Sequence, residues 1–278
     1  MLTKVLGTGP ALTVSAFVPD MDYFSGRGAK DVIPLYRDAE AMHANLHPEL
    51  QGTLLGALGY PVSAGDFAAY LYGILSCSAF VDEFHDELEN RELRVPISLD
   101  PDLFKEAVAI GRRLIFLHTF GERFGEGQTW PKPIIKCQKA VPSGRMPESY
   151  SYIEERSVIS IDGGEFGPVP LAVWNFEVSG LKVVQSWLGY RVKDRKGKKS
   201  SPLDAITPKE WGSEITSEFL SLLNLLNATL ELHEHQEKLL ARIFDCPLMS
   251  AAQLSIVPEQ WRNAPKIQGK QQAFSLHD

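Results

Sequence analysis

The sequence contains few cysteines and no long apolar run. Its three cysteines, Cys77, Cys137 and Cys246, lie far apart and form no CxxC pair. Isolated thiols of odd number indicate neither a disulfide framework nor a zinc site. No window of about 18 apolar residues occurs, so we expect no membrane-spanning segment. The first residues also lack the charged, apolar and cleavage regions of a secretory signal. These absences lead us to expect a protein of the reducing cytoplasm.

The motifs of common catalytic and metal sites are absent as well. The segment GTGPAL, residues 7–12, lacks the Lys-Ser/Thr pair of a phosphate loop, and there is no GxSxG elbow and no HExxH helix. His233 and His235 fall on different faces of a helix, while His118 lies on an apolar stripe and is expected to be a hydrogen-bonded core histidine. The Asn/Asp-Pro-Pro-Tyr/Phe tetrapeptide of amino-methyltransferases is missing. We therefore predict no catalytic residue, no metal site and no cofactor in this chain.

Charge is distributed unevenly along the sequence. The net charge of −7 argues against general, charge-driven binding of nucleic acid. Residues 82–92 are acidic, and this run is expected to be a solvated helix face. Residues 132–145 carry four cations and no acid, and residues 191–199 carry six cations against Asp194 alone. The composition thus permits binding of a polyanion at local basic sites without predicting it.

Hydrophobic periodicity and capping signals predict a mixed α+β fold with helical excess. A Pro-initiated helix is expected over residues 48–58, a second helix after the N-cap Ser63, an acidic helix over residues 79–90, and another after the N-cap Asp100 and Pro101. The apolar stripe over residues 213–244, interrupted once near Gln236 and Glu237, predicts a long amphipathic helix. Shorter helices are expected over residues 171–174 and 181–191. Strands are expected over residues 11–18, 32–38, 133–138, 150–153, 157–161 and 164–169.

These elements predict a helical scaffold with a small β-rich layer and a long C-terminal amphipathic helix. The helical parts would cover about residues 48–124 and 171–245, and the β-rich part about residues 125–168. Residues 1–262 would form one domain, followed by a polar, mobile tail over residues 263–278.

The segment 171–201, LAVWNFEVSGLKVVQSWLGYRVKDRKGKKSS, joins an apolar, aromatic part to the densest basic cluster. A core-anchored segment that leads directly into a basic loop is one way in which a scaffold presents cations to a polyanion. Trp174 and Trp187 are expected to anchor this loop rather than to stack on a ligand. A solvated helix end followed by a free loop is the alternative for the lysine run.

Several of these motifs resemble the C-terminal region of type ISP restriction-modification enzymes, the single-polypeptide type I systems. The similar stretches run from about residue 12 to residue 262. They include VSAFVPDMDYF…KDVIPLYRD, DPDLFKEAVAIGRRLIFLHTFGERF and, most distinctively, VWNFEVSGLKVVQSWLGYR followed by SSPLDAI. In that family a nuclease, a translocating ATPase, an N6-adenine methyltransferase and a C-terminal target recognition domain share one polypeptide. The chain resembles the last of these.

The resemblance implies sequence-specific recognition of double-stranded DNA for phage defence. The chain would place a target adenine for an N6-adenine methyltransferase module, while S-adenosylmethionine, ATP and Mg²⁺ would belong to the partner methyltransferase, translocase and nuclease modules. The alternative is a protein-docking module that contacts those partners without reading DNA. From the basic loops we predict DNA contact by Lys30, Arg37, Lys136, Arg145, Tyr190, Arg191, Lys193, Arg195, Lys196, Lys198 and Lys199.

Overall fold

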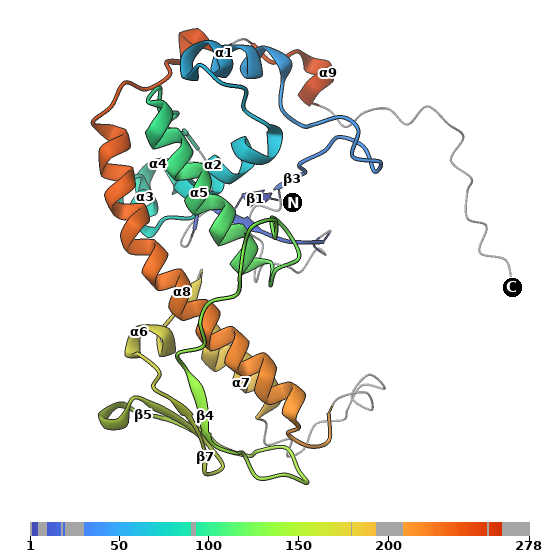
Figure 1. Cartoon of the computed structure of the whole chain (residues 1–278), viewed down its shortest axis with the longest axis vertical. Coiled ribbons are helices and arrows are strands. Elements are labelled where there is room, and N and C mark those ends of the chain that lie inside the picture. The colour runs from blue at the N-terminus through green and yellow to red at the C-terminus, as the bar shows by residue number, and fades with distance from the viewer. Residues whose placement is uncertain are drawn as a thin grey trace, which may run out of the picture.

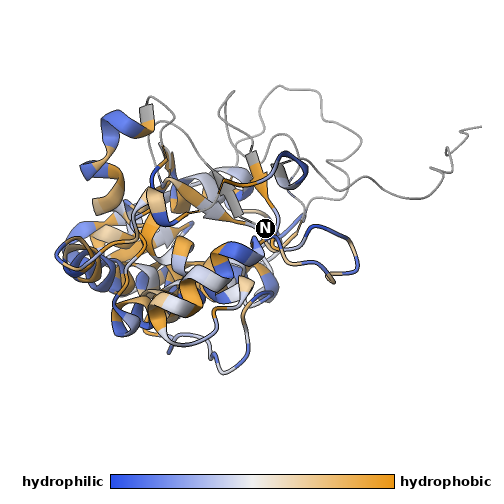
Figure 2. Ribbon diagram, turned by 90° about the horizontal axis from the view of Figure 1, so that it is seen from above, coloured by the Kyte–Doolittle hydropathy of each residue, from blue (hydrophilic) through white to orange (hydrophobic). Residues whose placement is uncertain are grey.

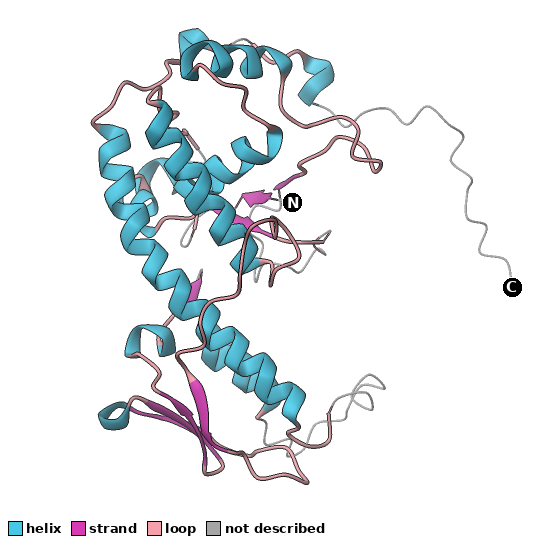
Figure 3. Cartoon of the chain, viewed as in Figure 1, coloured by secondary structure: helices cyan, strands magenta, loops and turns pink. Residues whose placement is uncertain are grey.

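The computed structural model describes residues 2–4, 10–17, 19, 31–89, 93–178, 180–192, 208–254 and 256–262. These residues form two lobes that share one long helix, α8 (Ser213–Phe244), which runs along much of the length of the molecule (Figure 1). Helices dominate one lobe and an antiparallel sheet lies in the other (Figure 3). The predicted mixed α+β fold with a long helix near the C-terminus is confirmed.

The helical lobe contains the N-terminal part of the chain. Three short strands pair antiparallel in the order β2-β1-β3 and lie beside helix α2. The elements of this lobe are β1 (Leu2–Lys4), β2 (Leu12–Val14), β3 (Asp31–Ile33), α1 (Pro48–Leu58), α2 (Ala64–Leu75), α3 (Ser78–Glu83), α4 (His85–Glu89) and α5 (Pro101–His118). Figure 2 shows hydrophobic and hydrophilic stretches alternating along the helices, as expected for amphipathic helices around a core.

The caps expected from the sequence fix the starts of α2 and α5. The Ser63 hydroxyl accepts a hydrogen bond from the Asp66 amide at 3.0 Å, and the Asp100 carboxylate accepts from two amides of the first turn of α5. Between these starts the two helices pack very closely, because Gly73 and Gly111 lie at their contact. A Cβ atom at Gly111 would overlap the backbone carbonyl of Ala69, so only glycine allows this approach.

His118 links three helices through both of its ring nitrogens. Its Nδ1 lies 2.7 Å from the Tyr72 hydroxyl on α2, and its Nε2 lies 3.1 Å from the Thr229 hydroxyl on α8. Burial, reinforced by nearby His233, lowers the pKa of His118 to about 4. The prediction of a hydrogen-bonded core histidine is confirmed, and the neutral ring helps to hold α2, α5 and α8 together.

The second lobe is built on a four-stranded antiparallel sheet in the order β4-β7-β6-β5. Helices α6 and α7 and the first half of α8 supply the hydrophobic residues that pack against it, among them Val173, Leu188 and Phe219. Its elements are β4 (Lys136–Lys139), β5 (Tyr150–Ile153), the 3-10 turn η1 (Glu154–Arg156), β6 (Val158–Ile161), β7 (Gly164–Gly167), α6 (Leu171–Trp174), β8 (Glu177–Val178), β9 (Leu181–Lys182) and α7 (Val183–Arg191).

Helix α8 contributes to both hydrophobic cores. Leu223 and Leu226 lie in the core of the sheet lobe, while Leu239 and Ile243 lie in the core of the helical lobe. Helix α8 continues through the expected interruption of the apolar stripe at Gln236. The Gln236 side chain is buried and its Nε2 donates to the Gly73 carbonyl at 2.8 Å, so a polar residue occupies a core-facing position there.

Two further expectations differ from the structure. The acidic helix expected over residues 79–90 is divided into α3 and α4, because Phe84 leaves the helical conformation. The helix expected over residues 181–191 begins only at Val183, because Leu181 and Lys182 form β9 and pair with β8.

After α8 the chain returns along the helical lobe through η3 (Ala251–Gln253) and α9 (Glu259–Arg262). The Leu99 amide donates to the Pro247 carbonyl, and the Met249 amide donates to the Ile97 carbonyl. The tail expected over residues 263–278 lies outside the described residues. None of the described helices combines the length and apolar character needed to cross a bilayer.

Candidate nucleic-acid interface

Helix α7 positions two of the predicted DNA-contacting residues at its last turn. Its buried residues Val184 and Leu188 hold the helix against the core of the sheet lobe. Tyr190, on the opposite side, is 75% exposed, which is unusual for a tyrosine so close to a core. The end of α7 therefore presents an aromatic ring to solvent beside Arg191.

Arg191 is oriented by contacts with an aromatic ring and a carboxylate. Its guanidinium carbon lies 3.8 Å from the centre of the Trp187 ring, a cation–π distance. One of its NH groups donates to the Glu218 carboxylate on α8 at 3.2 Å. The cation is thus held at the C-terminal end of α7, where the helix dipole also favours positive charge.

The end of α7 is the point where the chain enters the basic segment, which we define as residues 193–207. Lys193, Arg195, Lys196, Lys198 and Lys199 belong to it and lie outside the described residues, as does Lys30. The chain is described again from residue 208, and Trp211 then packs back onto Trp187, with ring centroids 6.0 Å apart. This aromatic contact therefore joins the described residues that flank the basic segment.

Trp211 is the most deeply buried tryptophan of an aromatic cluster that also contains Trp187 and Phe219. It is only 4% exposed, and its Nε1 donates to the Thr216 hydroxyl at 2.9 Å. Phe219 stacks on Trp187 at 4.9 Å and meets the Trp211 ring edge to face at 6.3 Å. Trp187 is only half-buried, so Trp211 rather than Trp187 is the deeply buried anchor. No sequence pattern had singled out Trp211.

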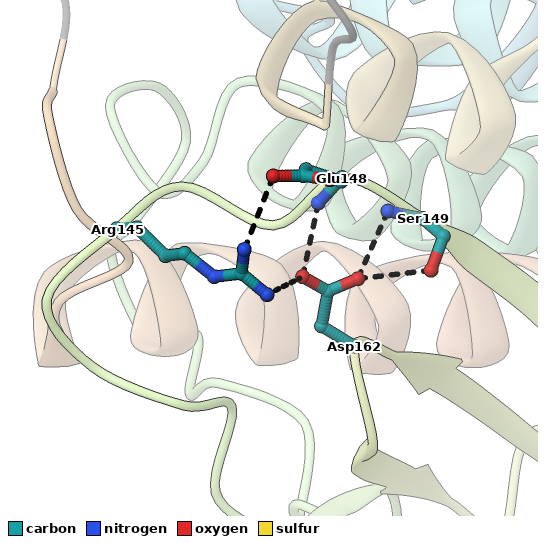
Figure 4. Close-up of polar contacts among 4 residues, drawn as sticks. All are labelled: Arg145, Glu148, Ser149 and Asp162. Atoms are coloured by element: carbon teal, nitrogen blue, oxygen red, sulfur yellow. Dashed lines mark hydrogen bonds and ion pairs between the residues drawn. The ribbon is translucent and has the colours of Figure 1, made fainter.

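Arg145 lies at the returning end of the basic segment. Its carbonyl accepts from the Trp211 amide at 3.2 Å, while the Gly144 amide donates to the Glu210 carboxylate. Its guanidinium forms ion pairs with Glu148 at 3.1 Å and with Asp162 at 3.5 Å (Figure 4). The Arg145 side chain is still 61% exposed, so one side of the cation remains open to solvent.

Asp162 is the centre of the network around Arg145 (Figure 4). It accepts hydrogen bonds from the Glu148 amide and from the amide and hydroxyl of Ser149, at 2.9–3.0 Å. Burial opposes its ionisation, but these hydrogen bonds and Arg145 outweigh burial and lower the pKa of Asp162. The ionised carboxylate fixes the turn from which Arg145 projects.

The remaining described candidates lie elsewhere. Lys136 is exposed at the start of β4, the edge strand of the sheet. Arg37 lies in the helical lobe, where its guanidinium stacks on Trp261 at 4.4 Å and donates to the Trp261 carbonyl at 2.8 Å. Arg145 and Arg191 are thus connected through Trp211 and Trp187, with Tyr190 next to Arg191, whereas Arg37 lies against the C-terminal segment.

A hollow of about 470 Å³ lies next to the Arg191–Glu218 pair. Phe120, Trp187 and Leu222 provide an apolar lining, and Ser217, Glu218 and Ser221 add polar groups. Phe120 is 53% exposed and has a positive φ of 51°, a strained conformation that turns its ring out of the end of α5. Sequence reasoning missed Phe120, since neither its neighbours nor its spacing marks it.

Within the described part of the chain, no group of three His, Cys, Asp or Glu side chains is arranged to hold a metal ion. His233 packs against Phe176, with ring centroids 5.9 Å apart, whereas His235 is exposed and its Nδ1 contacts the Glu231 carbonyl. The two histidines thus face different neighbours. The exposed cation of Arg145 and the exposed ring of Tyr190 beside Arg191 suit contact with a polyanion.

Comparisons with known proteins agree with this assessment. A family model described as "Type ISP C-terminal specificity domain" matches residues 1–222. A search of curated proteins finds no match. Among solved structures, the chain is similar to part of DrdV in a cryoEM complex with DNA, with a TM-score of 0.57 and 16% identity over 85% of this chain.

Two type ISP restriction-modification enzymes show the same fold. A nuclease-deletion mutant of LlaGI in complex with a DNA substrate mimic gives a TM-score of 0.52 and 18% identity over 90% of this chain. LlaBIII bound to DNA, an ATP-dependent enzyme, gives 0.51 and 14% over 89%. This chain spans 24% of the DrdV chain, 21% of the LlaGI chain and 16% of the LlaBIII chain.

Proposed function

The chain belongs to the family of type ISP C-terminal specificity domains, and from this membership we propose that it recognises a specific sequence in double-stranded DNA for a restriction-modification system. It would hold the duplex so that a partner N6-adenine methyltransferase module reaches one adenine of the site. Such enzymes act on a base that is turned out of the stack, so the recognising domain must fix the position of the duplex. Catalysis and its cofactors would belong to the partner modules.

The observation that carries this proposal is the basic segment together with the contact between Trp187 and Trp211 that flanks it. Six cations occur between residues 191 and 199, and a contact between Trp187 and Trp211 joins the described residues on either side of the basic segment. Lys and Arg on phosphates position a protein on DNA, whereas base edges are read by a few further side chains. We propose that Arg145, Arg191 and the cations of the basic segment contact phosphates, with Tyr190 at the same surface and Lys136 on the same lobe.

The similar structures support the same function. The DrdV, LlaGI and LlaBIII structures are each complexes with DNA or a DNA substrate mimic. The net charge of −7 is compatible with this role, because other modules of a longer assembly would supply much of the general phosphate contact.

The decisive experiment is a titration of the chain against a randomised pool of DNA duplexes at two salt concentrations. We expect enrichment of one short motif and an affinity that falls steeply as salt rises. Binding without any enriched motif would contradict sequence recognition.

A second function is favoured by one observation: the chain spans a quarter or less of the structures that it resembles, so most of such an assembly would be partner modules. A docking module would bind the methyltransferase or translocase module but no duplex. If the chain binds no DNA at low salt but binds the methyltransferase module, docking is favoured over recognition.

A further inference from the structure

A second basic site lies away from the basic segment, in a groove between α5, the segment 131–134 and α8. The groove has a volume of about 300 Å³. Arg113, Lys132, Asn227 and His235 supply polar groups, Ile134 supplies apolar surface, and Glu231 is the one carboxylate that lines it. We call this site the Arg113 groove. None of these residues was among the predicted DNA contacts.

The wall that carries Lys132 is fixed to α8 by one buried side chain. The Asn224 Oδ1 accepts hydrogen bonds from the Ile134 and Ile135 amides at 2.8 and 3.0 Å, and its Nδ2 donates to the Ile135 carbonyl at 2.9 Å. An asparagine that meets three backbone groups ties an otherwise irregular segment to a helix. One side of the groove is therefore held in place by defined hydrogen bonds to α8.

Among the described residues, Arg113 is a half-buried cation without an anionic partner. One of its NH groups donates to the Gln128 side-chain oxygen at 3.2 Å and to the Thr129 carbonyl at 2.6 Å, both of which are neutral acceptors. No carboxylate of the described residues lies within ion-pair distance of it. Burial accordingly lowers the pKa of Arg113, with no opposing charge.

The neighbouring arginine, Arg112, differs from Arg113 because it has an anionic partner. Arg112 on the same helix forms a 2.7 Å ion pair with Asp66. Buried or half-buried charges are normally paired in this way, because desolvation without a counter-charge is unfavourable. Arg113 and the exposed Lys132 therefore leave the groove with positive charge that an anionic ligand would neutralise.

The groove and the hollow beside Arg191 open along the same face of α8. Ser217 and Ser221 line the hollow, while Ala228 and His235 line the groove. Spacings of four and seven residues place these side chains on one helix face. At a rise of 1.5 Å per residue, the two sites are centred roughly 15 Å apart along the helix.

We propose that the Arg113 groove binds a phosphate of the DNA backbone, as a second anchor beside the contacts at the basic segment. This inference rests on the proposed function. Arg113 would supply its free NH donors to the phosphate oxygens, and Lys132 would add a mobile positive charge at the rim. The contact would fix the orientation of the duplex and would be independent of its sequence.

The first test removes charge from the groove and from a matched site on α8. Duplex affinity is measured over a range of salt concentrations for the whole chain, for Lys132→Ala and for Lys238→Ala, which removes an exposed lysine of α8 outside the groove. Lys132→Ala should weaken binding to all sequences alike and lower the slope of log affinity against log salt by about 1, since each phosphate contact contributes about 0.9. Lys238→Ala should keep the wild-type slope.

The second test asks for a gain of binding, which a damaged fold would not produce. Glu231→Gln removes the carboxylate from the groove and should tighten DNA binding by about 2- to 5-fold, because that carboxylate repels a phosphate. Glu234→Gln, an exposed neighbour on α8 outside the groove, is the matched control and should change affinity little.

The outcomes separate this inference from the proposed function. If the wild-type chain binds no duplex, the proposed function fails and the groove proposal fails with it. If the wild type binds duplex but both groove variants behave like their controls, only the groove proposal is overturned. Unchanged DNA affinity with weaker binding of Lys132→Ala to the methyltransferase module would instead identify an acidic protein surface as the ligand.

Discussion

Trp187 and Trp211 stand at the two ends of the basic segment and meet edge to face, with ring centroids 6.0 Å apart at an interplanar angle of 76°. The contact joins α7 to the chain that returns before α8. It holds the described residues on either side of the basic segment against the sheet lobe.

Trp211→Ala should destabilise the protein by about 3–5 kcal/mol, because a nearly fully buried indole is replaced by a cavity. Urea unfolding measures this change. Trp187→Ala should cost less, since Trp187 is only half-buried. Trp130→Ala is a suitable control, because that side chain is 48% exposed and its removal should cost well under half as much. Equal effects at Trp130 and Trp211 would contradict the assignment of Trp211 as anchor.

Replacement of Lys196, Lys198 and Lys199 by alanine should weaken DNA binding and leave the unfolding midpoint unchanged. If each lysine contacts one phosphate, the salt slope should fall by about 0.9 for each residue removed. The double variant Lys105→Ala/Lys238→Ala removes exposed lysines of α5 and α8 away from the basic segment and serves as control. Wild-type affinity in the triple variant would exclude the basic segment from the interface.

His118 should make the stability depend on pH in mildly acidic solution. Its pKa is about 4 in the folded protein, below the ordinary value of 6.5, so the unfolded chain binds more protons between these two values. Its contribution is therefore present above pH 6.5 and is lost as the pH falls toward 4, by up to about 3 kcal/mol.

The measurement is the free energy of unfolding at pH 7 and at pH 5. His118→Gln, which can still bond Tyr72 and Thr229, should lose less stability between these pH values than the wild type. The idea is refuted if His118→Gln and the wild type show the same pH dependence.

Gly111→Ala should destabilise the protein by more than about 3 kcal/mol, because its Cβ would overlap the Ala69 carbonyl where α2 and α5 touch. Gly52→Ala on α1 has open space around the new methyl group and should stabilise the helix by about 0.5–1 kcal/mol. Thermal unfolding of the two variants should thus shift in opposite directions. A shift of the same sign would show that the backbone contact at Gly111 relaxes easily.

Local signals in the sequence were sufficient for most helices. The start of α1 at Pro48 and that of α5 after Asp100 were predicted correctly, because prolines and N-caps act within one turn of the chain. The bounds of α8 were also predicted, since its apolar stripe persists over nine turns. The division at Phe84 was missed, because it depends on packing against Phe244, a residue far along the chain.

Contacts between distant residues explain the rest of what was missed. Gln236 interrupts the apolar pattern of α8, but its hydrogen bond to Gly73 makes it a core residue. Arg37 was read as a cation free for DNA, yet it stacks on Trp261, more than 200 residues later. Whether Arg37 also contacts DNA stays a prediction. The Arg113 groove depends on three separate segments and carries no local motif.

Helix α8 also connects the two hydrophobic cores mechanically. Leu223 is packed in one core and Leu240 in the other, and the rigid rod between them is about 25 Å long at 1.5 Å per residue. A tilt of about 5° at the sheet end would move the far end by roughly 2 Å. Close-packed cores transmit such displacements instead of absorbing them. A displacement of the sheet lobe would therefore be transmitted to the helical lobe, where Arg37 contacts Trp261 of the returning chain.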